Sequence, residues 1–376
     1  MIHNSSYITN KLKNLINESV QRMTMGKVHY GVFLSGGLDS SIITSFLSRN
    51  QEEPLKTFSI GYSHDIFQNE SDHAKRLALD MGADHHEILF EAKDMEKFPT
   101  IVWHQDEPIS DASSILTYSL SKKAKRYVKF VLVGEGADEI FAGYKRYHDL
   151  GDTGRNFNTQ DILNHINVYD YKERNKIFMD KMHPHIKKNC FRQYNHYFSP
   201  KKCPIKAFQS LDLVSWLPND VLLKNDKQTM ANSIEARVPF LDTSLYQFAR
   251  KIPTSLLINK QNEKIILKKA VKGIVPDYIL KRKKQGFHIP TQYLIENGFK
   301  ESAENVLENS LLIRDKYINK DFIDKVHKRI PKENKNSLNS SLNQFWNFFY
   351  LENWYNLFIE RNIFNMNGGL TLGELY

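Results

Sequence analysis

A short segment rich in serine and glycine, Ser35-Gly36-Gly37-Leu38-Asp39-Ser40-Ser41, is the strongest chemical signal in the sequence. It lies between an apolar run that ends at Leu34 and a helical pattern of apolar residues. Glycines allow a tight turn that brings backbone N–H groups close to an anion. The start of the next helix adds its positive dipole end, and the serines add hydroxyl donors. We predict that this turn holds the pyrophosphate part of a nucleotide.

The segment lacks the lysine of the Gly-x-x-x-x-Gly-Lys-Ser/Thr phosphate loop. A loop without that lysine suits enzymes that cleave ATP between the α and β phosphates. A simpler alternative is a strand-to-helix turn in which a serine or Asp39 only caps the helix. The complete run from Ser35 to Ser41 favours the nucleotide interpretation.

A second segment, Gly134-Glu135-Gly136-Ala137-Asp138-Glu139, follows the apolar run 130–133. Ligands of open α/β sheets bind at the carboxyl ends of the strands. Three acids at one turn repel one another unless cations are present, and Mg²⁺ prefers one or two carboxylates together with phosphate oxygens. We therefore expect ATP and Mg²⁺ at these two turns. An acidic helix start that the dipole favours is the alternative.

Elements that position these turns alternate between strand and helix over the first 150 residues. Strands are predicted at 28–34, 57–62, 85–90 and 130–133, and helices at 12–23, 42–47, 70–81 and 113–125. This order predicts an α/β fold with a doubly wound parallel sheet. From about residue 155 the pattern is predominantly helical, and the aromatic run 345–358 predicts a helix that faces the core. Residues 151–158 are the best candidate for a mobile loop.

The composition excludes several classes of protein. The 376 residues are 41% hydrophobic and 12% aromatic, which is typical of a folded chain. The two cysteines are not arranged as a disulfide framework or a zinc cage, and no apolar run approaches the roughly 18 residues that span a bilayer. We expect a cytoplasmic protein without a membrane partner. We interpret the net charge of +9, including the run Lys281–Lys284, mainly as solvated surface; attraction of an anionic substrate and nucleic-acid binding are alternatives.

Ser35 to Ser41 matches the PP-loop signature of ATP pyrophosphatases, and the longer pattern resembles the synthetase domain of asparagine synthetases. Matching blocks stand in family order from about residue 10 to 360, at 106–108 with Asp111 and Ser113, 134–139, 141–144, 146–147, 230–242 and 283–287. The resemblance implies one asparagine-synthetase-like domain over residues 1–376. It would consist of a PP-loop core up to about residue 150 and a mostly helical remainder packed on it.

The resemblance also implies site residues. The nucleotide pocket would comprise Leu34, Ile60, Val133 and Gly134, and pyrophosphate and magnesium would bind at Ser35, Gly36, Gly37, Asp39 and Ser40. The second magnesium acid would be Asp138, the catalytic glutamate Glu135, and the lysine against the phosphates Lys264. Weaker matches to the substrate and pyrophosphate region are Asp111, Asp220 and Asp226. A solvated residue on an amphipathic helix is the alternative for Lys264. A structural ion pair is favoured for Arg237, and a surface or sheet-edge position, rather than a metal site, for His85 and His86.

The implied function is an ATP-dependent amide ligase that activates a carboxylate, aspartate first among the candidates, as an acyl-adenylate and then adds ammonia. The glutaminase domain of full asparagine synthetases starts with an exposed cysteine, whereas residue 2 here is Ile2. We therefore expect ammonia from solution or from a separate glutaminase subunit. An intramolecular cyclase of the β-lactam synthetase or lasso-peptide type, or another amidotransferase, is the alternative. A tRNA-modifying PP-loop enzyme is less favoured, because active cysteines and zinc ribbons are missing. The sequence leaves a homo-oligomer open.

Overall fold

The computed structural model describes residues 5–49, 53–62, 70–151, 168–186, 203–284, 286, 289, 299–330, 340–361 and 371. The chain forms two compact units. The first unit comprises residues 1–90, 116–156 and 199–287, and the second comprises residues 91–115, 157–198 and 288–376. A division into a core and a helical remainder at about residue 150 stays a prediction. The expected loop at 151–158 lies outside the described residues, except for Gly151 at the end of a helix.

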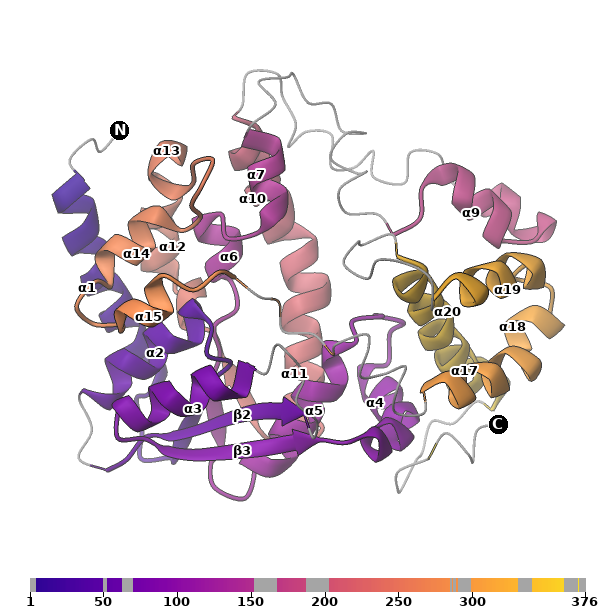
Figure 1. The fold of residues 1–376 in the computed structure, drawn as a ribbon, viewed down its shortest axis with the longest axis horizontal. Helices are drawn as coiled ribbons and strands as arrows, with labels where there is room; N and C mark the ends of the chain where they lie inside the picture. Colours follow the sequence, from indigo (N-terminus) through magenta and orange to yellow (C-terminus); the bar gives the residue numbers. More distant parts are fainter. Residues whose placement is uncertain are drawn as a thin grey trace. The chain divides into compact units, whose positions relative to one another are not determined.

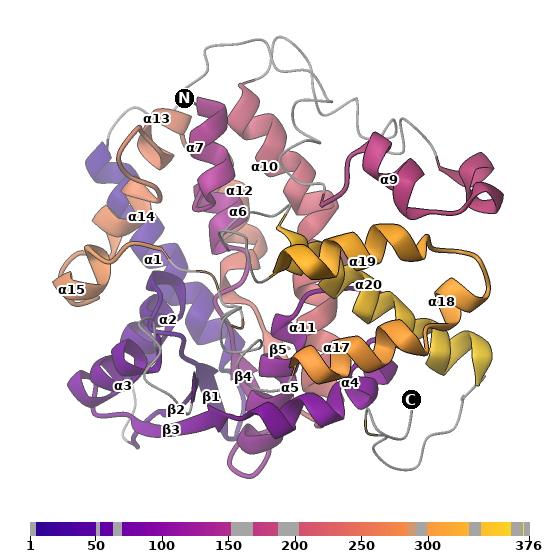
Figure 2. The ribbon, with the colours of Figure 1, turned by 45° about the vertical axis from the view of Figure 1, so that its right-hand side comes forward.

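A five-stranded parallel sheet is the centre of the first unit in the described part of the chain (Figures 1 and 2). Its strands are β1 (Tyr30–Phe33), β2 (Lys56–Tyr62), β3 (Asp84–Phe90), β4 (Phe130–Leu132) and β5 (Glu235–Arg237), in the order β3-β2-β1-β4-β5. The strand order reverses beside β1, so right-handed crossovers place helices on both faces. The predicted doubly wound sheet is confirmed. Strand β5, however, comes from a region that the sequence pattern predicts as helical.

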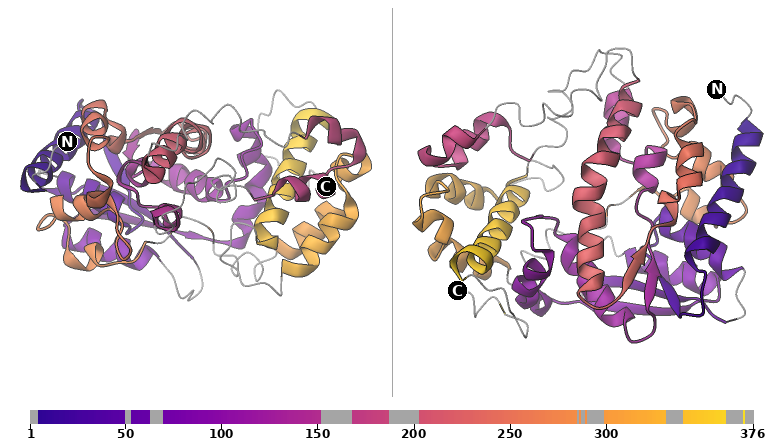
Figure 3. Two further views of the ribbon diagram at one scale, coloured as in Figure 1. Left: turned by 90° about the horizontal axis from the view of Figure 1, so that it is seen from above. Right: turned by 180° about the vertical axis from the view of Figure 1, so that it is seen from behind.

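Helices surround this sheet within the first unit. They are α1 (Ser5–Met23), α2 (Leu38–Ser48), α3 (Glu70–Asp80), α6 (Ala137–Phe141), α7 (Lys145–Gly151), α10 (Pro204–Val214), η4 (Leu217–Leu222), α11 (Leu223–Met230), η5 (Pro239–Leu241), α12 (Thr243–Ala249), α13 (Thr254–Leu257), α14 (Ile265–Ala270) and α15 (Asp277–Leu280). Helix α5 (Ser113–Ala124) crosses the boundary between the units. The indigo helix α1 contacts α12 and α14, and both views of Figure 3 show it beside these orange helices.

The second unit is helical in its described residues. Its elements are η1 (Ala92–Lys97), α4 (Phe98–Gln105), α9 (Tyr171–Ile177), η2 (Asp180–His185), α17 (Phe299–Glu308), α18 (Leu311–Arg314), α19 (Lys320–Arg329), α20 (Ser341–Tyr355) and η7 (Asn356–Glu360). Helix α20 is at its centre and contacts α4, α17, α18 and α19. Phe345, Phe348 and Phe349 are at most 2% exposed, which confirms that the aromatic run forms a core helix. Phe98 packs against this run with a centroid separation of 5.0 Å from Phe349.

Apolar side chains of the central strands form the core of the first unit. Val32, Phe58 and Leu132 are completely buried. The register pairs Val32 of β1 with Thr57 of β2 and Leu132 of β4. The turns that follow β1 and β4 therefore leave neighbouring strand ends. Among the described residues, no helix combines the length and the apolar composition that crossing a bilayer requires.

Candidate active site

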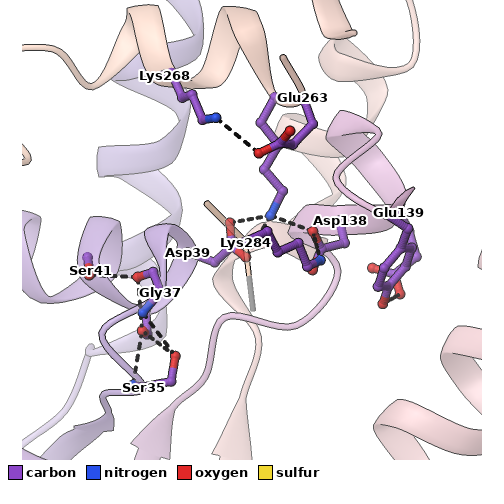
Figure 4. Close-up of polar contacts among 12 residues, drawn as sticks. Ser35, Gly37, Asp39, Ser41, Asp138, Glu139, Glu263, Lys268 and Lys284 are labelled. Atoms are coloured by element: carbon purple, nitrogen blue, oxygen red, sulfur yellow. Dashed lines mark hydrogen bonds and ion pairs between the residues drawn. The ribbon is translucent and has the colours of Figure 1, made fainter. Parts of the chain in front are cut away.

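The turn after β1 is organised by its own serines and glycines. Gly36 has a left-handed φ of 71°, and Gly37 is the extended residue that precedes α2. The Ser35 and Ser40 hydroxyls are 3.2 Å apart, and the Gly37 backbone N–H donates to Ser35 Oγ at 3.3 Å. Ser41 donates to the Gly37 carbonyl at 2.6 Å, as Figure 4 shows. Glycine is needed at position 36 because its backbone is left-handed. The turn thus has the predicted strand–loop–helix context of an anion cradle.

The turn after β4 approaches the start of α2 closely. A Cβ atom on Gly134 would lie 2.9 Å from Asp39 Cβ and 3.1 Å from the Ser40 backbone nitrogen. Any side chain at position 134 would therefore push the two turns apart. Gly136, with a φ of 86°, then starts α6, which carries Asp138. The two acids predicted from separate segments, Asp39 and Asp138, are consequently brought together.

A buried lysine lies between these two acids. Lys264 Nζ is 2.6 Å from both carboxylate oxygens of Asp39 and 2.7 Å from Asp138 Oδ1. The Lys264 side chain is 3% exposed, which excludes the alternative of a solvated helix residue. The left-handed backbone of Lys264 (φ 52°), just before α14, is uncommon for a residue with a side chain. Such strain is typical of functional positions.

Electrostatic shifts in this cluster follow from burial and from the lysines. Burial raises the pKa of Asp39, even though the Lys264 charge opposes that shift. Burial also acts to raise the pKa of Asp138, but Lys264 and Lys284 outweigh it and hold that pKa well below the usual aspartate value. Burial would lower the pKa of Lys264, and the Asp138 and Asp39 carboxylates reverse the effect and raise it. The lysine therefore carries its charge at neutral pH.

Two cations from the run Lys281–Lys284 also belong to the site, although the sequence pattern suggests solvated surface for that run. Lys284 Nζ forms an ion pair with Asp138 (Figure 4). Arg282 Nη1 donates to the Gly36 carbonyl at 2.8 Å. Lys284 is exposed and Arg282 half-buried, so the surface interpretation holds in part, but both side chains also contact site residues. The signal that could have found Lys284 is its place in the matching block 283–287, to which no role was assigned.

Gly143 is a second residue that sequence reasoning missed. A Cβ atom at this position would lie 2.0 Å from Asp138 Oδ1 and 2.1 Å from Lys264 Cε. A glycine is therefore required for the lysine stem to reach the acids. The preceding Ala142 is left-handed, with a φ of 55°, and ends helix α6. The matching block 141–144 contains both residues, but block membership alone does not reveal this steric role.

Glu135 follows Gly134 at the same strand end. Burial raises the pKa of its carboxyl group, while the charge of Lys224 and the nearby Asn225 side chain oppose the shift. Lys224 and Asn225 are 6% and 5% exposed and lie at the start of α11, directly after the π-helical segment η4. A carboxylate whose pKa is raised is a stronger base than an ordinary glutamate, which suits a role in proton transfer.

The remaining predicted residues are distributed as follows. Leu34, Ile60 and Val133 are buried at or beside the carboxyl ends of β1, β2 and β4. Asp220 lies within η4, and Asp226 is exposed in the first turn of α11. Asp111 belongs to the second unit, where its Oδ1 accepts the Ser113 backbone N–H at 2.8 Å. Lys224 and Asn225, which lie beside Glu135, are site residues to which the sequence reasoning assigned no role.

The structure also bears on two interpretations of residues outside the site, the ion pair of Arg237 and the position of His85 and His86. Arg237 forms the predicted structural ion pair, with Glu235 at 2.9 Å. The nearby Asp242 pairs with Arg22 at 2.9 Å. The His85 ring contacts two hydroxyl groups, those of Thr57 at 2.9 Å and Ser59 at 3.0 Å. Within the residues that the structure describes, no three His, Cys, Asp or Glu side chains form a metal-binding group.

Comparison with known proteins identifies the family of this chain. The asparagine synthase family model matches residues 11–356. The chain is 34% identical over 349 residues to asparagine synthetase [glutamine-hydrolyzing] 1 of Bacillus subtilis, an alignment that covers 84% of this chain and 55% of that protein. It is 29% identical to asparagine synthetase [glutamine-hydrolyzing] 3 of B. subtilis, with 73% and 47% covered. It is 28% identical to asparagine synthetase [glutamine-hydrolyzing] 2 of Oryza sativa, with 82% and 46% covered.

The family match extends over both turns and over the segments that contain Lys264 and Lys284, because it runs almost from end to end. The chain spans about half the length of the curated relatives it matches. The family match, in turn, covers far more than half of the chain. The chain belongs to the asparagine synthase family.

Proposed function

We propose that this chain is an ATP-dependent amide ligase of the asparagine synthetase type. It would activate a carboxylate as an acyl-adenylate, release pyrophosphate and form an amide with ammonia. The single observation that carries the proposal is the contact of Lys264 with both Asp39 of the first turn and Asp138 of the second. This contact joins the nucleotide turn, the acidic turn and a buried cation in one cluster.

ATP would bind with its triphosphate at the turn from Ser35 to Ser40. The backbone N–H groups at the start of α2 and the serine hydroxyls are the donors. Leu34, Ile60, Val133 and Gly134 would form the pocket of the nucleoside. Lys264 and Lys284 carry positive charge beside Asp138, where the leaving pyrophosphate gains negative charge.

Asp39 and Asp138 are suited to hold Mg²⁺. Two carboxylates with phosphate oxygens are the ligand set that Mg²⁺ prefers. Both carboxylates already bind one cation, the Lys264 ammonium, at 2.6 and 2.7 Å, so a positive charge fits between them. When bound, Mg²⁺ would neutralise the phosphate oxygens and stabilise pyrophosphate as it leaves.

The adenylation step forms one bond and breaks one. An oxygen of the substrate carboxylate attacks the α phosphorus of ATP, and the bond between that phosphorus and the bridging oxygen of pyrophosphate breaks. The acyl carbon then carries AMP as its leaving group, which a free carboxylate lacks. Lys264 stabilises the negative charge that develops, because its raised pKa keeps it protonated.

The amidation step uses ammonia as the nucleophile. Ammonia adds to the acyl carbon, its nitrogen becomes positively charged, and AMP departs. Glu135 would accept the proton that the nitrogen loses. Its buried carboxyl group, with a raised pKa, suits this exchange better than an exposed acid. Lys224 and Asn225, which lie beside it, would help to hold Glu135 in place.

Aspartate is the proposed carboxylate, since the matched relatives are named asparagine synthetases. Ammonia would come from solution or from a separate glutaminase. The deciding experiment combines ATP, Mg²⁺, ammonium and aspartate labelled with 18O in its carboxylates. We expect asparagine, pyrophosphate and AMP that contains one labelled oxygen. ADP and orthophosphate, or AMP without label, would refute the acyl-adenylate.

A panel of other carboxylates, each compared with aspartate, tests the substrate assignment. Pyrophosphate release that another carboxylate supports, but aspartate does not, would keep the ligase chemistry and reject asparagine formation.

Asp138→Asn tests the metal assignment, because one carboxylate oxygen becomes an amide. We expect its half-maximal Mg²⁺ concentration to rise about tenfold. Asp277→Asn, whose side chain is 67% exposed, is the matched control and should leave the Mg²⁺ dependence unchanged.

A further inference from the structure

Tyr144 lies between α6 and α7 and contacts the active-site cation Lys284. Lys284 Nζ is 4.2 Å from the centroid of the Tyr144 ring. The same ammonium forms the ion pair with Asp138. An ammonium over an aromatic ring is attracted by the negative face of the ring. Tyr144 therefore contacts a lysine on which the site depends, although the adenylation and amidation steps do not use Tyr144 itself.

The Tyr144 ring is itself held by a buried network. Its hydroxyl donates to Glu139 Oε1 at 2.7 Å, and Glu139 is 1% exposed. Gln209 of α10 donates to the Glu139 carbonyl at 2.6 Å. The Arg146 guanidinium carbon lies 4.2 Å from the Tyr144 centroid, and Arg146 pairs with the buried Asp212 at 2.9 Å. Contacts from α6, α7 and α10 thus fix the ring.

In the part of this segment that the structure describes, Lys284 does not lie in a helix or strand that would hold its backbone in place. It lies in an irregular stretch after α15. Its side chain is 30% exposed, compared with 3% for Lys264. A lysine has a flexible stem of four carbons, and its ammonium becomes useful for charge stabilisation only where it is held in place.

We propose that Tyr144 is a positioning residue, whose ring holds the Lys284 ammonium against Asp138 and thereby directs it to the phosphates. This inference rests on the proposed function for its kinetic consequence. The placement of Lys284 itself is a property of the folded chain and can be measured without turnover. The two claims can therefore fail separately.

The first test measures the placement of Lys284 by competitive acetylation at limiting reagent, read by mass spectrometry. Lys283 is exposed and adjacent, so it is the internal standard. Tyr144→Leu removes the ring, and Tyr144→Phe keeps the ring but removes the hydroxyl. We expect the reactivity ratio of Lys284 to Lys283 to rise severalfold in Tyr144→Leu and to stay near the wild-type value in Tyr144→Phe. An unchanged ratio in Tyr144→Leu overturns the proposal.

The second test measures pyrophosphate release. We expect Tyr144→Leu to lower kcat about tenfold with a much smaller change in the KM for ATP, and Tyr144→Phe to recover most of the rate. Tyr147→Phe is the matched control, because its hydroxyl also binds a carboxylate, Asp212 at 2.5 Å, away from Lys284. Tyr147→Phe should alter the thermal midpoint without altering kcat. Equal losses of kcat in Tyr144→Phe and Tyr144→Leu would assign the effect to the hydroxyl and overturn the ring's role.

A folding control keeps the result decisive. If Tyr144→Leu does not fold, Tyr144→Met fills a similar volume with a flexible apolar chain that has no aromatic face. The same rise in the reactivity of Lys284 is expected, and its absence again overturns the proposal. If the wild-type chain releases no pyrophosphate with any carboxylate, the proposed function fails. The acetylation ratio still decides whether Tyr144 positions Lys284.

Discussion

Lys264 Nζ lies 2.6 Å from both carboxylate oxygens of Asp39, a residue 225 positions earlier in the chain. The contact links the helix after the first strand to a helix near the end of the first unit. The lysine of this pair is buried, since its side chain is 3% exposed. Burial makes such a pair sensitive to the loss of either partner, which leads to the first prediction.

Lys264→Met should abolish most of the pyrophosphate release. We expect kcat to fall by about 100-fold or more, because a fixed cation beside the developing charge is lost. The free energy of unfolding should also fall by roughly 3 kcal/mol, because Asp39 loses its cation and Asp138 loses one of two. Lys268→Met on the same helix is the control. Lys268 pairs with Glu263 at 3.2 Å (Figure 4), away from the two aspartates, and its loss should leave kcat intact.

Gly143→Ala tests the close approach of the backbone to the lysine stem. The added methyl group would overlap Asp138 Oδ1 and Lys264 Cε, so the ion pair must separate. We expect a loss of kcat of about tenfold or more in steady-state assays. Gly82→Ala adds a methyl group at a left-handed position (φ 64°) with open space around it, so it should cost about 1 kcal/mol of stability without a kinetic effect. A normal rate in Gly143→Ala would contradict this account.

Arg282→Met tests the support of the nucleotide turn. Arg282 donates to the Gly36 carbonyl at 2.8 Å and thereby fixes the turn from the side of α15. We expect the KM for ATP to rise about threefold to tenfold, with a smaller change in kcat. Lys281→Met is the neighbouring control, because the Lys281 side chain is 80% exposed and should not affect ATP binding. Equal effects of both variants would indicate general surface electrostatics instead.

Glu352→Gln tests a buried carboxyl group of the second unit. Glu352 accepts from Ser310 Oγ at 2.6 Å and from the Leu311 N–H at 2.7 Å, and burial raises its pKa despite these donors. A raised folded-state pKa means that the folded chain binds this proton more tightly than the unfolded chain. The contribution is therefore full below the unfolded pKa of about 4.5 and is lost as pH rises through the folded pKa.

Urea unfolding of the wild type and Glu352→Gln at several pH values measures this effect. The stability advantage of the wild type should shrink as the pH rises from about 4 towards neutral. Glu360→Gln is the control, because this carboxylate is 42% exposed and pairs with Arg314 at the surface. Its difference from the wild type should not shrink with rising pH. A wild-type advantage that grows with pH would show that the hydrogen bonds lower the pKa of Glu352 more than burial raises it.

The sequence predicts the parts of the fold that depend on local pattern. Strands β1 and β4 are largely apolar runs that end at turn residues, and the PP-loop segment lies between β1 and the next helix, so these features are readable from the chain alone. Strand β5 is Glu235-Ala236-Arg237, which has no apolar run. It is a strand only because β4 offers a free edge for pairing, as in Leu132 with Arg237. Such a tertiary cause leaves no local signal.

The same distinction applies to the site. Asp39 and Asp138 are identified by the turns that carry them, since the carboxyl ends of parallel strands must meet. Lys284 and Gly143 stand in blocks that match the family, but their roles follow only from what they touch in space, the Asp138 carboxylate and the Lys264 stem. Lys284 also stands in a run of basic residues, and the charge pattern alone suggests surface. The predicted structural ion pair of Arg237 is confirmed, and its partner is Glu235.

The order of the site residues along the chain has a consequence for biosynthesis. A ribosome completes the segments with Asp39 and Asp138 long before it reaches Lys264 and Lys284. Until then the two carboxylates have neither lysine as a counter-ion, and the edge of β4 lacks the strand that covers it. A nascent chain that stops short of α14 would carry the nucleotide turn without its neutralising charges. Translation therefore has to run almost to the end of the first unit before the proposed ATP site can assemble.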